Sequence, residues 1–134
     1  MIRPMREELT SAGFEELKTA DEVAAWQGQR EGVGFLVINS VCGCAAGMAR
    51  PGVRQALENA PKRPDHAATV FAGQDVEATA SARSLFPQVP PSSPSMALIK
   101  DGELVFFLPR HRIEGRTAED VSSDLTAAFE EHCG

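Results

Sequence analysis

The sequence lacks any hydrophobic run long enough to cross a membrane, and it has little positive charge. Its opening residues, MIRPMREE, carry charges where a secretion signal needs an apolar segment. Lys and Arg number 13 against 19 Asp and Glu, which gives a net charge of −6. The basic residues cluster only at Lys62-Arg63 and at residues 110–112, so nucleic acid is not an expected partner. We therefore expect a cytoplasmic protein that binds neither membranes nor nucleic acids.

Cysteine is scarce, with three residues in 134. A chain of this length with 43% hydrophobic content can bury a core without disulfides, and an odd count argues against a structural disulfide framework. The length fits a single domain, residues 1–134. Two of the cysteines nevertheless lie one residue apart, in Cys42-Gly43-Cys44. In a reducing compartment, such a pair favours redox chemistry or metal binding.

The cysteine pair lies at a predicted junction between a strand and a helix. Residues 33–38, VGFLVI, form a short apolar run typical of a buried strand, and apolar residues then recur at helical spacing over residues 43–60. The free N–H groups and partial positive charge of a helix N-terminus favour a thiolate, so Cys42 is expected to titrate below the ordinary thiol value of about 8.5. One thiolate can attack a disulfide, and the second thiol can release the mixed disulfide that results.

Gly43 has a physical role between the two cysteines. Closing a disulfide across one intervening residue requires unusual backbone angles, which glycine adopts at low cost. A strained disulfide is more easily reduced, so the pair is predicted to be a better oxidant or isomerase than a strong reductant.

Two other interpretations of the pair stay open on the residues alone. Cysteine is often a small buried hydrophobe with no chemical role. A Cys-x-Cys pair can also bind a soft metal, which would make the chain a zinc or copper binding or delivery protein. Four residues could serve as further ligands, although none has the paired spacing of a metal motif: His66, His111, His132 and Cys133.

Cys133 lies one residue from the end of the sequence. Chain ends are poorly ordered unless something ties them down, so we expect a solvent-exposed thiol in a frayed tail. An additional redox thiol is the alternative.

The rest of the chain alternates predicted strands and helices. The apolar spacing after Pro4 is irregular, and this first segment is treated as an arm. Pro51 should kink the helix that contains it, Asp75 should cap a helix or border the site, and Asp101-Gly102 should form a hairpin turn. In chain order the expected elements are an edge strand at residues 14–18, a helix at 19–29, a strand at 33–39, a helix at 43–60, a strand at 67–72, a helix between Asp75 and Pro87, strands at 96–100 and 103–108, and a helix from Thr117 to about Cys133. This order predicts an α/β sheet with parallel neighbours and an antiparallel C-terminal hairpin.

The predicted order resembles the thioredoxin arrangement, a three-layer α/β/α sandwich around a mixed sheet. Residues 94–103, PSMALIKDGE, resemble the thioredoxin segment that runs from a cis-proline into the hairpin. The chain is more closely similar to the bacilliredoxin family, thioredoxin-like proteins with Cys-Gly-Cys in place of Cys-x-x-Cys. The stretches that carry this resemblance are residues 37–51 (VINSVCGCAAGMARP), 70–79 (VFAGQDVEAT), 91–103 (PSSPSMALIKDGE) and 113–116 (IEGR).

The resemblance implies a function and a role for each site residue. The implied reaction is reduction of mixed disulfides between proteins and the small thiol bacillithiol, with weak disulfide isomerase activity. Cys42 would be the attacking thiol and Cys44 the resolving thiol. Ser93 and Pro94, joined by a cis bond, would face the cysteines and bind substrate together with Gly43. The implied partners are S-thiolated or disulfide-containing proteins and a low-molecular-weight thiol as co-substrate, with no cofactor and no resident metal.

Overall fold

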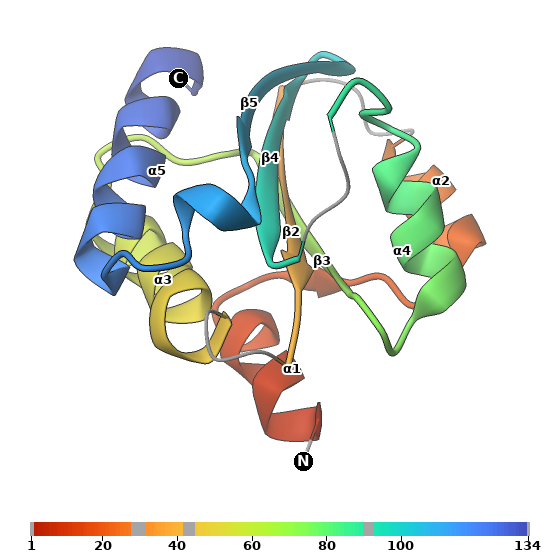
Figure 1. Cartoon of the computed structure of the whole chain (residues 1–134). Helices are drawn as coiled ribbons and strands as arrows, with labels where there is room; N and C mark the ends of the chain where they lie inside the picture. The colour runs from red at the N-terminus through yellow and green to blue at the C-terminus, as the bar shows by residue number, and fades with distance from the viewer. Residues whose placement is uncertain (1, 28–31, 42–44, 90–92, 134) are drawn as a thin grey trace.

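A five-stranded mixed sheet forms the centre of the computed structural model, which describes residues 2–27, 32–41, 45–89 and 93–133. The strand order is β1-β3-β2-β4-β5 (Figure 1). The three strands β1, β3 and β2 are mutually parallel, β4 pairs antiparallel with β2, and β5 pairs antiparallel with β4. Their bounds are β1 Glu15–Glu16, β2 Val33–Asn39, β3 His66–Phe71, β4 Ser95–Lys100 and β5 Glu103–Leu108.

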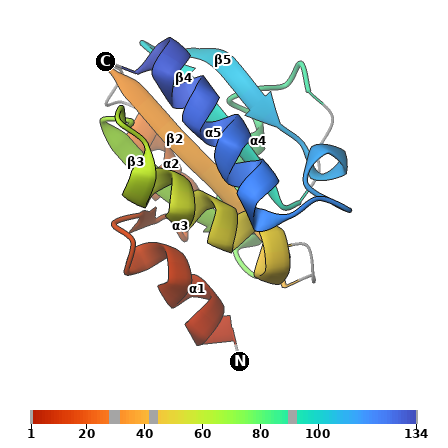
Figure 2. The ribbon, with the colours of Figure 1, turned by 90° about the vertical axis from the view of Figure 1, so that its left-hand side faces the viewer.

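Helices cover both faces of the sheet. The helices α3 and α5 lie on one face and α2 and α4 on the other, while α1 lies beside α3 and β1 (Figures 1 and 2). The helices are α1 Ile2–Thr10, α2 Ala20–Gln27, the π-helix η1 Ala45–Ala49, α3 Arg50–Asn59, α4 Val76–Arg83, the 3₁₀ helix η2 Arg110–Arg112 and α5 Ala118–His132. None of the helices in the described ranges is long and apolar enough to cross a membrane. The three-layer α/β/α sandwich predicted from the sequence is confirmed.

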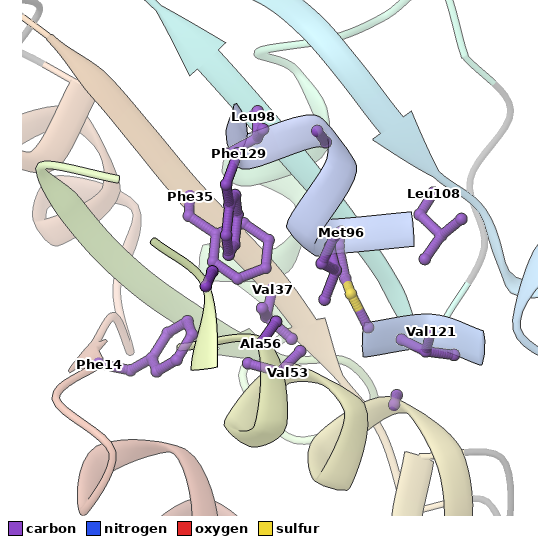
Figure 3. Packing of buried hydrophobic residues seen from close by; sticks show 14 of the residues in the cluster. Phe14, Phe35, Val37, Val53, Ala56, Met96, Leu98, Leu108, Val121 and Phe129 are labelled. Carbon is purple, nitrogen blue, oxygen red and sulfur yellow. The ribbon is translucent and has the colours of Figure 1, made fainter. Parts of the chain in front are cut away.

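The core lies on both sides of β2, whose seven residues are all buried. The sequence of such a strand is a continuous apolar run because helices cover both of its faces. On the side of α3 and α5, the Phe35 ring meets the Phe129 ring edge-on, with centroids 5.3 Å apart, and Phe14 packs next to Phe35 (Figure 3). On the side of α2 and α4, Trp26 and Phe86 belong to a second apolar cluster. Each buried phenylalanine stabilises the fold by about 1.5–3 kcal/mol.

The N-terminal segment corrects the sequence prediction. It forms the regular helix α1 and not an arm. Leu9 at its last turn is fully buried in the larger core cluster, and Arg6 on the same helix binds side chains of later elements. Long-range contacts stabilise this helix, so its irregular apolar spacing did not predict it.

The helix predicted at residues 43–60 is divided in two. The π-helix η1 ends at Ala49, and the α-helix α3 begins at Arg50. Pro51 is the second residue of α3, directly after this change of helix type. The sequence predicted a kink at Pro51, whereas the structure shows a change of helix type between Ala49 and Arg50. The predicted helix start at Gly43 lies outside the described residues.

Candidate active site

The carboxyl end of β2 and the start of β4 meet at one edge of the sheet. Ile38 of β2 pairs with Ser95 of β4, and the residue that precedes Ser95 is Pro94. After the end of β2 the chain continues through Ser40 to Val41, which is 51% exposed and directly precedes Cys42. The strand register therefore brings the segment that leads into Cys-Gly-Cys alongside the Ser93-Pro94 segment.

The site residues predicted from the sequence are only partly described by the structure. Cys42, Gly43 and Cys44 lie outside the described residues, and so does any contact between Pro94 and the cysteines. The Ser93-Pro94 peptide bond is cis, as the resemblance implied. Pro94 is buried and Ser93 is half-buried.

Arg110 lies next to this proline segment. It belongs to η2, which follows β5, and its Nη1 donates a hydrogen bond to the Ser93 carbonyl at 3.3 Å. Its Nε donates to Glu114 Oε2 at 2.9 Å. The sequence marked Arg110 only as part of a basic cluster, because nothing local in the sequence connects it to Ser93, 17 residues earlier.

A buried arginine, Arg50, binds residues at the carboxyl end of β2. The Arg50 side chain is 2% exposed, and its Nη1 donates to both Asn39 Oδ1 and the Ser40 carbonyl at 2.9 Å. Its Nε donates to Glu8 Oε1 of α1 at 2.8 Å. Asn39 Oδ1 also accepts the backbone N–H of Ser40 at 2.8 Å, and its amide group donates to the carbonyl of Met5 at 3.2 Å. This network was missed in the sequence because its members are far apart along the chain.

Asp75 does not have the role predicted from the sequence. It occupies the N-cap position of α4, but its side chain makes no capping hydrogen bond. Both carboxylate oxygens instead accept from the Arg6 guanidinium, at 2.7 and 3.1 Å. Arg6 also binds Glu16 and lies 5.0 Å from the centroid of the Phe71 ring. The hydrogen bond to Asp75 is the main reason that the pKa of Arg6 is raised.

Cys133 also departs from its prediction. It is 5% exposed and packs in the larger core cluster, because α5 continues to His132 and holds the end of the chain against the sheet. Burial raises the pKa of its thiol, and the nearby Asp65 carboxylate adds to this effect. Asp65 binds the backbone of Val33, at the start of β2. Because Cys133 is buried, it is not a thiol in a frayed tail. It lies near the start of β2, at the opposite end of this strand from Ser40.

The other residues considered as metal ligands are dispersed. His66 begins β3, His111 is exposed in η2, and His132 ends α5. Within the part of the chain that the structure describes, no three His, Cys, Asp or Glu residues form a group that could hold a metal ion. The further ligands that a metal site would need are thus not gathered among these residues.

Comparisons with known proteins identify the family and agree with the fold. Residues 1–133 match the family model described as disulphide isomerase. A bacilliredoxin of Geobacillus kaustophilus is 54% identical over 134 residues, which cover 100% of this chain and 92% of that protein. A bacilliredoxin of Bacillus cereus is 53% identical over 133 residues, which cover 99% of this chain and 92% of that protein.

Solved thioredoxin structures share the fold at low sequence identity. The thioredoxin of Fasciola hepatica superposes with a TM-score of 0.62 at 21% identity, covering 89% of this chain and 99% of that one. A thioredoxin variant of Halobacterium salinarum superposes with a TM-score of 0.61 at 18% identity, covering 92% and 93%. The chain therefore belongs to the bacilliredoxins, a family of thiol–disulfide oxidoreductases with the thioredoxin fold.

Proposed function

We propose that this protein reduces mixed disulfides between cytoplasmic proteins and bacillithiol, with Cys42 as the attacking thiol and Cys44 as the resolving thiol. The observation that carries the proposal is the strand register that brings the chain entering Cys-Gly-Cys beside Ser93-Pro94, in a chain 54% identical to a bacilliredoxin. Isomerase activity would use the same pair of thiols and is a minor activity in this proposal.

The reaction consists of two thiol–disulfide exchanges. The Cys42 thiolate attacks the bacillithiol sulfur of the mixed disulfide, which forms a Cys42–bacillithiol disulfide and releases the protein thiolate. The Cys44 thiolate then attacks Cys42 Sγ and releases bacillithiol. The protein substrate is reduced by two electrons, and the enzyme ends as a Cys42–Cys44 disulfide. A further thiol or dithiol reductant must return the pair to its reduced form.

Single cysteine variants test the roles of the two thiols. Incubation of Cys44→Ser with a bacillithiolated protein should trap a bacillithiol adduct on Cys42, because attack proceeds and resolution cannot. The Cys42→Ser variant should trap little, and mass spectrometry of digested protein identifies the modified residue. An adduct that accumulates on Cys44 would reverse the assignment.

The same protein substrate modified with glutathione serves as the matched control. A preference for the bacillithiol adduct supports the proposed co-substrate, whereas equal trapping of both thiols would limit the proposal to a general reductase of mixed disulfides.

Metal analysis of protein purified under reducing conditions tests the competing function. Stoichiometric zinc or copper that is lost in both cysteine variants would favour a metal-binding protein.

A further inference from the structure

Arg50 is a buried cation at the start of α3. It directly follows the π-helix η1, and its neighbour Ala49 is itself helical. The Arg50 side chain is 2% exposed, and a buried charge is costly unless it is paired and hydrogen-bonded. The Glu8 carboxylate contacts Arg50. The Glu8 side chain is 34% exposed, so water screens part of its negative charge. A guanidinium is therefore held at the end of β2, paired with the partly screened Glu8 carboxylate and hydrogen-bonded to Asn39 and Ser40.

The contacts of Arg50 connect it to the segment that enters Cys42. Its Nη1 donates to the Ser40 carbonyl and to the Asn39 side chain, each at 2.9 Å. Ser40 precedes Cys42 by two residues, and two peptide units reach no further than about 7 Å. The attraction between a guanidinium and a thiolate favours the ionised form of the thiol and weakens in inverse proportion to the distance between them.

Two other arginines near this edge are paired with carboxylates in the described part of the chain. Arg6 of α1 binds Asp75 and Glu16, and Arg110 of η2 binds Glu114. The Arg50–Glu8 pair differs from both, because its cation also donates directly to the backbone of the segment that leads to Cys42.

We propose that Arg50 is a positioning residue for the attacking thiol: it holds Asn39 and Ser40 in place, and its charge favours the Cys42 thiolate, while the Glu8 carboxylate weakens this effect. The proposal rests on the proposed role of Cys42 as the attacking thiol.

An electrostatic role predicts opposite effects at the two ends of the ion pair. Arg50→Met removes the cation, so less of Cys42 should be ionised at a given pH. Glu8→Gln keeps a hydrogen-bond acceptor for Arg50 but removes the negative charge, so more of Cys42 should be ionised. A purely structural role predicts that both variants move the thiol in the same direction or leave it unchanged, since both weaken the same contact.

The measurement is thiolate absorbance against pH in the Cys44→Ser background. Subtracting the signal of a Cys42→Ser/Cys44→Ser protein removes the contribution of Cys133. Below the midpoint, the thiolate fraction should fall by about threefold to tenfold in Arg50→Met and rise in Glu8→Gln. Arg63→Met is the control for net charge, because Arg63 is exposed and lies beyond the far end of α3. It should leave the titration unchanged.

Each result supports or overturns the proposal. Opposite shifts in Arg50→Met and Glu8→Gln support it, and shifts in one direction or no shifts overturn it. If Arg50→Met does not fold, Glu8→Gln alone decides, because its thiolate fraction must rise. The titration needs no substrate, so it is independent of the trapping experiment. Failure to trap an adduct in Cys44→Ser contradicts the proposed function, whereas unchanged titrations with normal trapping contradict only the role of Arg50.

Discussion

Arg6 in the first helix binds both carboxylate oxygens of Asp75, 69 residues further along the chain, at 2.7 and 3.1 Å. The same guanidinium binds Glu16 and lies over the ring of Phe71. The three charged side chains are only 12–22% exposed, so water screens their interaction less than it screens a surface ion pair. Arg6 therefore connects α1 to β1 and to the segment between β3 and α4.

Replacing Arg6 should destabilise the fold measurably. Arg6→Met keeps an apolar stem but leaves two partly buried carboxylates without their cation, and we expect the free energy of unfolding to fall by about 1–3 kcal/mol. Urea unfolding measures the change. Arg3 on the same helix is the matched control, because its side chain is 88% exposed and pairs with Glu7 at the surface. Arg3→Met should cost less than about 0.5 kcal/mol. Equal losses in the two variants would show that the buried cluster contributes no more than a surface pair.

A glycine allows α3 to approach α5 closely. A Cβ atom on Gly52 would lie 2.7 Å from Cβ and Cγ1 of Val121 and 3.0 Å from the carbonyl oxygen of Ala118. The Cβ of Val121 and the backbone carbonyl of Ala118 cannot move aside unless α5 shifts, so Gly52→Ala should lower the free energy of unfolding by about 1–3 kcal/mol.

Gly47 provides the control for Gly52, because a Cβ there would meet nothing within 4 Å. Alanine has the better helix propensity, so Gly47→Ala should leave stability unchanged or raise it by less than about 1 kcal/mol. Thermal unfolding of the two variants under identical conditions gives the comparison. If Gly52→Ala were as stable as Gly47→Ala, the close approach of the two helices would not be a constraint.

Arg110 should affect substrate binding more than chemistry. Its hydrogen bond to the Ser93 carbonyl orients the segment proposed to bind substrate, and it makes no bond that the two exchange reactions use. Arg110→Met should raise KM for a bacillithiolated protein by about threefold to tenfold with little change in kcat. Arg112→Met, two residues away and exposed, removes the same charge and should change neither constant. A fall in kcat at constant KM would contradict a role in binding.

The sequence predicted the elements whose signals are local. The strand at residues 33–39 has the predicted bounds, because a fully buried strand is a continuous apolar run. The hairpin strand at residues 103–108 also has the predicted bounds, since Asp101-Gly102 specifies a turn and Asp101 takes the positive φ that such a turn requires. Thr117 caps α5 through the predicted local hydrogen bond.

The missed features depend on residues far apart in the sequence. Arg50 contacts Glu8 and Asn39, which lie 42 and 11 residues away, and no spacing rule connects them. Asp75 has the local sequence of a helix cap, but the guanidinium of Arg6 outcompetes the helix N–H groups for its carboxylate. The resemblance, and not the residue pattern, predicted the cis bond before Pro94, because only a small minority of X-Pro bonds are cis.

Burial of Cys133 gives stability a dependence on pH in the alkaline range. Its folded pKa is raised above that of the unfolded chain, so the folded protein keeps the proton at a pH where the unfolded chain releases it. The stability that the neutral thiol contributes is fully present below the unfolded thiol pKa of about 8.5 and is lost as pH rises through the folded value. The loss cannot exceed about 1.4 kcal/mol per pH unit, because a single proton is involved.

The prediction is tested by unfolding with and without the thiol. In a Cys42→Ser/Cys44→Ser background, the free energy of unfolding is compared between Cys133 and Cys133→Ala from pH 7 to pH 10.5. The cavity left by the substitution contributes a constant difference. Lysines remote from residue 133 contribute equally to both proteins, whereas Lys62 and Lys100 act on the thiol and oppose the rise in its pKa. The chain has no tyrosine, so no phenol titrates in this range. The advantage of Cys133 should be constant up to about pH 8 and then shrink with rising pH. An advantage that stays constant to pH 10.5 would mean that the thiol ionises as readily in the folded protein as in the unfolded chain, and would contradict its burial beside Asp65.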